Sequence, residues 1–363
     1  MTAESATIVI SSAGRRLYLI EWFRAAFDTL GLNGRIIVAE NDASSAAASS
    51  GDETRLLPKY TEPGYGDEVL RLVDEVEPRL FLSANDYELM QLHVNTGLAD
   101  SLRDRGVFVP GVSAAWQRGC ADKLRMAQLL ESIGVQTPRT VRGSDLDDLL
   151  MRAESNDEFI VKHRFGSRSS GLAAATASQV VEAVANSAKS VPSRVDRTDS
   201  RDDVIVQHRA PGSEYGVDIV SSLLEEGSLS GVFARRKLRM RAGETDKAVT
   251  VDPGPFREAS GKIARAAELS GLIDVDMFLD DAGLVSVIDI NPRFGGGYPF
   301  VHLAGADVPL YYMGQIFGIP VDEGWNRYEP GVISAKYQET RVTARGTQED
   351  SESSNAVEQT QNT

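Results

Sequence analysis

The chain has 363 residues, and 53 acidic residues outnumber 38 basic ones, which gives a formal net charge of -15. This acidity excludes a general nucleic-acid binder and a protein that docks on an anionic membrane surface, because both need a basic face. The single Cys120 cannot form an internal disulfide, and the apolar runs are too short to span a bilayer. We therefore expect a cytoplasmic protein with two or three structural units.

Short apolar strands alternate with amphipathic helices in the first part of the chain. Strands are predicted at 7–12, 35–39 and 79–83, and helices at 16–30, 69–76 and 87–98. This alternation predicts a parallel sheet with helical crossovers, an α/β unit that ends near residue 112. Asp86 and Glu88 are interpreted as a feature of a helix N-terminus rather than as a catalytic pair.

The following residues mix helices with paired strands. Helices are predicted at 121–133, 175–189 and 256–270, and strands at 158–163, 204–207, 215–224, 228–237, 273–279 and 284–290. The turns at 225–227 and 280–283 predict two antiparallel hairpins. The final segment, 343–363, has almost no apolar residues and is predicted to be disordered.

The second hairpin carries the strongest chemical signal. Asp276 lies on one strand, and Asp289 and Asn291 lie two residues apart on the other, so this last pair shares a face. Three oxygen-bearing side chains suit Mg²⁺ (or Mn²⁺). Taken alone, the D-x-N-P string is more simply interpreted as the polar end of a strand. The wider string favours a phosphate site, because Arg293 and three glycines follow it: Gly295, Gly296 and Gly297.

A second signal is Lys162, which ends a predicted buried strand and precedes a loop rich in glycine and serine. Such a lysine supplies charge to phosphates, and the loop supplies donors from Gly166, Ser167, Ser169, Ser170 and Gly171. The loop is not a Walker A motif, because GxxxxGK[ST] is absent. A plain solvent loop is the alternative interpretation.

Two further segments are weaker signals. Gln207 ends a strand and Glu214 opens the next element, an arrangement that suits an adenine edge and a ribose, although an ordinary loop is the simpler interpretation. Five cations within 235–241 repel one another unless an anion lies among them. Strand alternation places Arg235, Lys237, Arg239 and Arg241 on one face, which favours a carboxylate or phosphate partner over a solvated strand edge.

Together these segments resemble the ATP-grasp superfamily, specifically its carbamoyl-phosphate-synthase-like carboxylate–amine ligases. The resemblance covers about residues 5–335 and includes the strings SSAGRR and SANDYEL and the Asp122-Lys123 pair. It implies a parallel-sheet pre-ATP-grasp domain (1–112), an N-terminal lobe (113–205) and a C-terminal lobe (206–342), with ATP between the two α+β lobes.

The resemblance also implies roles for individual residues. Phosphate contacts fall to Lys123, Lys162 and the mobile loop 164–171, the adenine hinge to Gln207, His208 and Ala210, the ribose to Glu214, and the metal to Asp276, Asp289 and Asn291. Arg293 is expected to steady the transferred phosphoryl group or the acyl phosphate. The segment with Arg239 and Arg241 borders the active site in this family. His163 replaces a common proline, and Gln207 and Asp289 replace common glutamates, but no required ligand type is lost.

The activity implied is ATP- and Mg²⁺-dependent amide formation between a small carboxylic acid and an amine such as an amino acid. Lys162, Lys123 and Arg293 are expected to neutralise charge, and the glycines at 295–297 to donate to an oxyanion. One alternative is a carboxylating or carbamoylating enzyme that uses bicarbonate. Another is a nucleotide-binding protein without turnover. Both substrates stay open, as does the assembly, for which a homodimer is one option.

Overall fold

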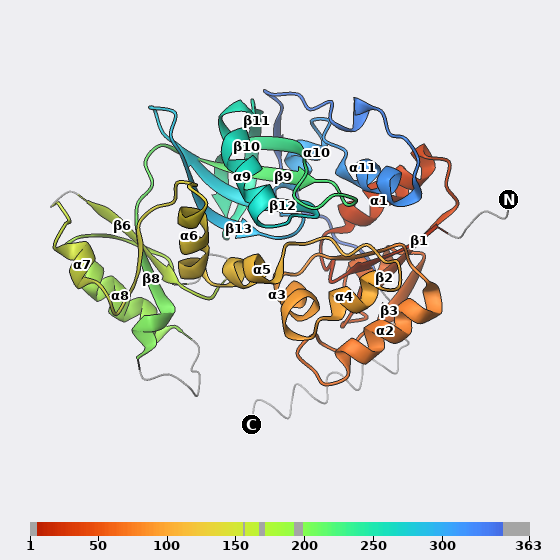
Figure 1. Ribbon diagram of the computed structural model, residues 1–363, viewed down its shortest axis with the longest axis horizontal. Helices are drawn as coiled ribbons and strands as arrows, with labels where there is room; N and C mark the ends of the chain where they lie inside the picture. The colour runs from red at the N-terminus through yellow and green to blue at the C-terminus, as the bar shows by residue number, and fades with distance from the viewer. Residues whose placement is uncertain (1–5, 155–156, 167–170, 192–198, 344–363) are drawn as a thin grey trace.

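The computed structural model describes residues 6–154, 157–166, 171–191 and 199–343. Apart from Thr343, the tail predicted to be disordered lies outside these residues. The described chain forms three sheets, which are coloured from red to blue along the chain in Figure 1. The smallest lobe, with β6, β8 and the helices beside them, extends to the left of the other two units.

The N-terminal unit is a four-stranded parallel sheet of order β3-β2-β1-β4. Its strands are β1 (Ala6–Ser11), β2 (Gly34–Glu40), β3 (Glu53–Leu56) and β4 (Leu80–Ser83). Ile8 and Ile10 pack with helix α1 (Leu17–Thr29) on one face, and Val9 packs with α2 (Tyr65–Val76) on the other. Successive strand side chains point to opposite faces, so both faces are apolar and covered. This confirms the predicted parallel α/β class.

The helices after this sheet are shorter than predicted. The helix predicted at 87–98 is α3 (Asp86–Met90) followed by a π-helical turn, η2 (Gln91–Asn95). A separate helix, α4 (Leu98–Arg103), begins after Gly97, whose φ of 64° is outside the right-handed helical region.

A second predicted helix, at 121–133, is also divided. Helices α5 (Ala114–Ala121) and α6 (Lys123–Ser132) meet at Asp122, which is extended and caps α6 by accepting the N–H groups of Leu124 and Arg125.

A small antiparallel sheet of order β5-β8-β6-β7 follows. Its strands are β5 (Thr140–Arg142), β6 (Glu158–His163), β7 (Ala173–Thr176) and β8 (Val204–His208), with helices α7 (Asp147–Leu150) and α8 (Val180–Lys189) and the short η3 (Ser200–Asp203). Its own core includes Phe159, Val184 and Val206. The predicted boundary at 205/206 falls inside β8.

The large sheet has six antiparallel strands in the order β13-β12-β9-β10-β11-β14. They are β9 (Ser213–Ser221), β10 (Leu229–Arg241), β11 (Glu244–Val251), β12 (Gly271–Leu279), β13 (Val285–Asn291) and β14 (Ile333–Ala335). Both predicted hairpins are present, as β9–β10 and β12–β13. Helices α5, α6 and α9 (Arg257–Ala266) share a core with one face of this sheet.

The other face of the large sheet shares its core with the N-terminal unit. Helix α1 packs along α11 (Val308–Phe317), and Trp22 stacks on His302 of α10 (Tyr298–His302) with ring centroids 3.7 Å apart. Phe23 meets Phe294 edge-on in the same cluster. The N-terminal unit is thereby held against the large lobe. Short 3₁₀ turns complete the fold: η1 (Ala47–Ser49), η4 (Gly254–Phe256) and η5 (Glu323–Trp325).

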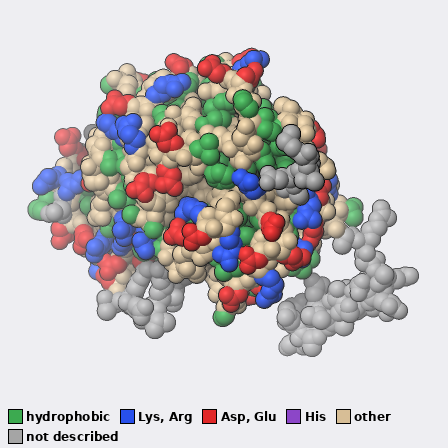
Figure 2. Space-filling model, turned by 45° about the vertical axis from the view of Figure 1, so that its right-hand side comes forward, with side chains coloured by type: hydrophobic (Ala, Val, Ile, Leu, Met, Phe, Trp, Pro, Cys, Tyr) green, Lys and Arg blue, Asp and Glu red, His purple; other side chains and the backbone are tan. Residues whose placement is uncertain are grey.

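Acidic and basic side chains are interspersed over the face shown in Figure 2. Ion pairs between neighbouring elements include Arg105 with Asp74 and Arg209 with Glu158. Within the described part of the chain, every helix is too short or too polar to cross a membrane.

Candidate active site

The start of α6 is tied to the strand that carries Lys162. Arg164 donates two hydrogen bonds to the Asp122 carboxylate, at 2.7 and 2.6 Å. Lys123 donates its Nζ to the carbonyl of Gly166 at 3.0 Å, and its own N–H to the carbonyl of Arg164. These bonds fix Lys123 beside the entrance to the predicted phosphate loop, so Asp122 positions a residue that the sequence assigned to phosphate.

Lys162 faces the large lobe from β6. Its ammonium interacts electrostatically with Asp289, Lys123, Asp276 and Glu214, which come from α6 and from three strands of the large sheet. Burial lowers its pKa to about 8, because desolvation disfavours the charged form. A partly desolvated cation between two lobes is well placed for an anionic ligand.

The two carboxylates predicted as metal ligands on the β12–β13 hairpin lie directly opposite each other. Asp276 is the register partner of Asp289, and Asp274 is the partner of Asn291. Lys237 of β10 donates to Asp276 Oδ1 at 2.7 Å and to Glu214 Oε1 at 2.6 Å. Lys123 Nζ lies 3.3 Å from Asp289 Oδ1. Each carboxylate therefore has a lysine as its counter-charge. Lys237 also connects the predicted metal ligand Asp276 with the predicted ribose acceptor Glu214.

These residues fit a hard divalent cation. Oxygen ligands from Asp276 and Asp289 on adjacent strands, with the Asn291 amide at the strand end, are the donor set that Mg²⁺ prefers. Burial raises the pKa of Asp276 to about 6, although Lys237 opposes the shift, so this carboxylate gains from a second cation. Among the described residues no group of three His, Cys, Asp or Glu side chains is arranged around a metal position. The set therefore needs Asn291 and ligand oxygens to complete it.

Arg235 is the buried centre of a separate ion cluster. It is 1% exposed and donates to Asp218 and Asp274. A Cβ on Gly297 would lie 2.1 Å from Arg235, and a Cβ on Gly295 would lie 2.2 Å from Asp274. Glycine is thus required at 295 and 297 by close packing, which is a different reason from the predicted oxyanion contact. Gly296 instead faces Lys336 and Glu244.

The cationic strand β10 differs from the sequence prediction. Arg235 and Lys237 share a face, but the pairing with β11 is irregular on both sides of Arg239. Arg239 contacts Asp246 and leaves 63% of its side chain exposed, and Arg241, opposite Glu244, is exposed. The irregular pairing interrupts the strict alternation assumed in the prediction that all four cations share one face, and that prediction stays untested beyond Arg235 and Lys237. The anions among these cations are carboxylates of the protein itself.

Arg293 lies in a second positive cluster, at the junction with the N-terminal unit. Its Nε and Nη2 donate to Asp86 Oδ2 at 2.9 and 2.7 Å. Asp86 lies in the first turn of α3, as predicted, but it is also the anchor of Arg293. Its Oδ1 is buried and has no hydrogen-bond partner among the described residues.

Arg16 lies beside this pair, a residue that the sequence analysis did not assign to the site. It donates to the carbonyl of Ala84 at 2.9 Å, and burial, followed by the charge of Arg293, lowers its pKa. Lys336 and Glu244 are 3.2 Å apart nearby. Two close guanidinium groups with one carboxylate between them leave a net positive charge, which suits a carboxylate or phosphoryl ligand.

The predicted adenine hinge has several of its groups engaged. The Gln207 side chain donates to Thr140 Oγ1 at 2.8 Å, and the N–H of His208 donates to the carbonyl of Arg139. Ala210 lies in the loop between β8 and β9. The contacts of Gln207, His208 and Ala210 with adenine therefore stay predictions.

The predicted phosphate loop is described in part. Gly171 has a φ of 65°, and a Cβ there would lie 2.3 Å from the ring of His163. His163 contacts Ser187 and Ser190 of the α8 region, a polar contact that the common proline could not make. Ser167, Ser169 and Ser170 lie outside the described residues.

The chain has the fold of ATP-grasp proteins, with charged groups between its lobes. The model of the family "PylC-like, N-terminal domain" matches residues 8–102. The family "ATP-grasp in the biosynthetic pathway with Ter operon" matches residues 200–337. Among curated proteins, none matches this sequence.

Solved structures with the same architecture support this assignment. A biotin carboxylase from Campylobacter jejuni superposes with a TM-score of 0.65 at 12% identity, over 90% of this chain and 74% of that one. An L-amino acid ligase from Bacillus licheniformis gives 0.64 at 16% identity, over 90% and 78%. An N5-carboxyaminoimidazole synthetase from Staphylococcus aureus, complexed with ADP, gives 0.64 at 14% identity, over 92% and 82%. The chain therefore has the ATP-grasp fold, and its residues 200–337 match an ATP-grasp family.

Proposed function

We propose that this protein is an ATP-dependent carboxylate–amine ligase that forms an amide through an acyl phosphate and releases ADP and phosphate. The observation that carries the proposal is the convergence of Lys162 and Lys123 on Asp276 and Asp289, beside a second cluster with Arg293. The structurally similar L-amino acid ligase supports it. The cytoplasm, expected from the sequence, supplies ATP and magnesium.

Each part of the nucleotide has a candidate partner. Lys123, Lys162 and Gly171 would contact the phosphates, Gln207, His208 and Ala210 the adenine, and Glu214 the ribose. Asp276, Asp289 and Asn291 would hold Mg²⁺ or Mn²⁺, which when bound neutralises phosphate charge. Because Lys237 and Lys123 now balance these carboxylates, we expect the lysines to reorient toward phosphate oxygens when the nucleotide binds.

The reaction proceeds in two displacements. A carboxylate oxygen of the acid attacks the γ-phosphorus of ATP, and the bond to the β-phosphate oxygen breaks. The amine then attacks the acyl carbon, loses a proton, and expels phosphate. Arg293 and Arg16 would orient the acid and hold the phosphoryl oxygens, while Lys162 stabilises charge that develops on the phosphates. This chemistry needs position and charge, and no protein nucleophile.

A bicarbonate-using carboxylase is the second candidate. Biotin carboxylase and N5-carboxyaminoimidazole synthetase superpose on the chain as well as the amino acid ligase does. Both candidates activate a carboxylate with ATP, and they differ in which carboxylate is activated. Transfer of a carboxylate oxygen from an organic acid to the released phosphate would identify the amide-forming ligase and distinguish it from the bicarbonate-using carboxylase.

Replacement of Arg293 by lysine tests the proposal. A lysine keeps the charge but loses the planar donor pair, so Arg293→Lys should lower acid-dependent ADP release by ~10²–10³ while ATP affinity changes little. Both quantities are measured on wild type and variant. Equal turnover would remove Arg293 from the mechanism. A wild type that binds ATP but never releases ADP with any acid and amine would instead favour a passive binder.

A further inference from the structure

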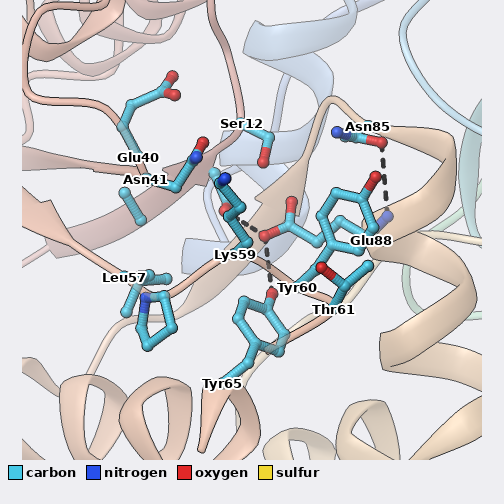
Figure 3. A pocket seen from close by; sticks show the side chains of 13 residues that line it. Ser12, Glu40, Asn41, Leu57, Lys59, Tyr60, Thr61, Tyr65, Asn85 and Glu88 are labelled. Atoms are coloured by element: carbon cyan, nitrogen blue, oxygen red, sulfur yellow. Dashed lines mark hydrogen bonds between the residues drawn. The ribbon is translucent and has the colours of Figure 1, made fainter. Parts of the chain in front are cut away.

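A cavity of about 240 Å³ lies at the carboxyl ends of the N-terminal strands. The segments after β1, β2, β3 and β4 all contribute to its wall (Figure 3). In open α/β sheets, ligands bind outside the carboxyl ends of strands, near the point where the strand order reverses. The order β3-β2-β1-β4 puts that point beside β1, whose last residue Ser11 lines the cavity.

The floor of the cavity is a buried carboxylate. Glu88 is 2% exposed and accepts hydrogen bonds from Ser11 at 2.6 Å, from Tyr65 at 2.7 Å, and from Ser83. Figure 3 shows the Tyr65 hydroxyl directed at this carboxylate. All three donors are neutral, so the charge of Glu88 is hydrogen-bonded but not compensated. Burial of such a charge is costly unless a cation is paired with it.

A second carboxylate lies close to the first. Glu40, at the end of β2, is 6% exposed and accepts the N–H of Gly14 at 2.8 Å. Burial and the nearby charge of Glu88 raise its pKa. Within the described part of the chain, the hydrogen bonds of both carboxylates come from neutral groups. Two buried acids without a cation form a site for a ligand that brings its own positive charge.

The wall of the cavity offers a separate, opposite charge. Lys59 lines it and is exposed, and the amide of Asn41 and the hydroxyl of Thr61 lie in the same lining. These groups suit a carboxylate on the same ligand. Pockets for drug-sized molecules have volumes of about 300–1,000 Å³, so this smaller cavity suits a compact molecule.

We infer that this cavity binds a free amino acid, with its ammonium group toward Glu40 and Glu88 and its carboxylate toward Lys59. The inference rests on the proposed ligase function and deepens it by naming the substrate class. Asn85 lines the cavity, and the next residue, Asp86, is the anchor of Arg293. A substrate held here therefore lies beside the segment that positions the proposed reaction centre.

Calorimetry with each standard amino acid, in both L and D forms, tests the inference. At least one should bind the wild type, and its N-acetyl derivative, which lacks the ammonium charge, should not. Glu88→Gln and Lys59→Ala should each weaken this binding about tenfold or more, which corresponds to ~1.4 kcal/mol. The matched variants Glu62→Gln and Arg71→Ala, at exposed positions outside the cavity lining, should leave the binding unchanged.

The outcomes separate this inference from the proposed function. If no amino acid binds, or if Glu88→Gln and Lys59→Ala bind as the wild type does, the cavity is not the site. Since Lys59 is exposed, its variant decides the question even if Glu88→Gln does not fold. If an amino acid binds and its binding depends on both residues, but no ADP is released, the binding site is supported and the ligase function is contradicted. If ADP is released and neither variant changes the KM, the ligase function is supported and the binding site is contradicted.

Discussion

The charged side chains of the candidate site lie in pairs that cross from one strand or lobe to another. Lys237 links Glu214 with Asp276, Lys123 approaches Asp289, and Arg293 is held by Asp86. Opposite charges at such distances hold each other in place in a partly desolvated site. Folding supplies the free energy that brings these charges together, so they are in place before a nucleotide binds.

Lys162 should make nucleotide binding depend on pH. Its pKa of about 8 means that the ammonium is charged at pH 7 and mostly neutral at pH 9. ATP affinity should therefore fall about tenfold between these values, since one pH unit beyond the pKa costs about 1.4 kcal/mol. Lys162→Arg stays charged and should flatten the profile. Identical profiles for wild type and variant, measured by calorimetry, would contradict this role.

Arg235 should contribute to the stability of the folded protein rather than to catalysis. Arg235→Ala leaves Asp218 and Asp274 buried without their cation, which typically destabilises a protein by about 3–5 kcal/mol. Arg236→Ala, at the exposed neighbouring position, is the matched control and should change stability by no more than ~0.5 kcal/mol. Urea unfolding of the two variants measures the difference. Similar values for both would show that the buried cluster contributes little.

For single residues, the sequence predicts which types of side chain form the site better than it predicts which side chains contact each other. The chemistry of Lys162, Asp276, Asp289 and Arg293 suits phosphate and metal, and the family resemblance adds Lys123. The partnership of Lys237 with Asp276 depends on the order of strands in the sheet, which no local spacing contains. Arg16 was missed because it stands in the SSAGRR string beside Arg15, and only the packing of α1 shows which arginine reaches Arg293.

Among the elements, the β12–β13 hairpin was predicted well, because its strands are apolar and its turn contains Asp280 and Gly283. Strands β3, β5, β7, β11 and β14 and helices α4, α5, α7, α10 and α11 were not predicted. Several of these are only three to five residues long, and α11 is apolar on most of its surface, so the periodic signal is weak. Their conformation depends on tertiary packing.

The start of α6 offers a test of how one element positions another. Asp122 caps this helix and also holds Arg164, so Asp122→Ala should lose about 1 kcal/mol of stability and also weaken ATP binding. Asp307→Ala removes the corresponding cap of α11, which lies against α1 and away from the predicted phosphate site. It should cost similar stability without an effect on ATP. Equal loss of ATP affinity in both variants would contradict the positioning role.

Across the whole molecule, the three units meet at the charged groups. The N-terminal unit is attached to the large lobe through α1 and α11, while the small sheet has a separate core. Alternation of strands and helices was sufficient to predict the parallel N-terminal sheet and three of its four strands. The shared core was not predictable from periodicity, since Trp22 and Phe23 form part of an ordinary amphipathic stripe until α10 and α11 are placed against it.

The central claim is that an organic carboxylate is activated by ATP, and oxygen transfer tests it most directly. Candidate acids, amino acids among them, are labelled with ¹⁸O in the carboxylate and incubated with the protein, Mg²⁺, ATP, an amine and unlabelled bicarbonate, and the released phosphate is analysed by mass spectrometry. We predict one ¹⁸O atom in each phosphate released with the substrate that supports ADP formation, because the acyl phosphate breaks at its carbon–oxygen bond. ADP release with unlabelled phosphate would contradict the account.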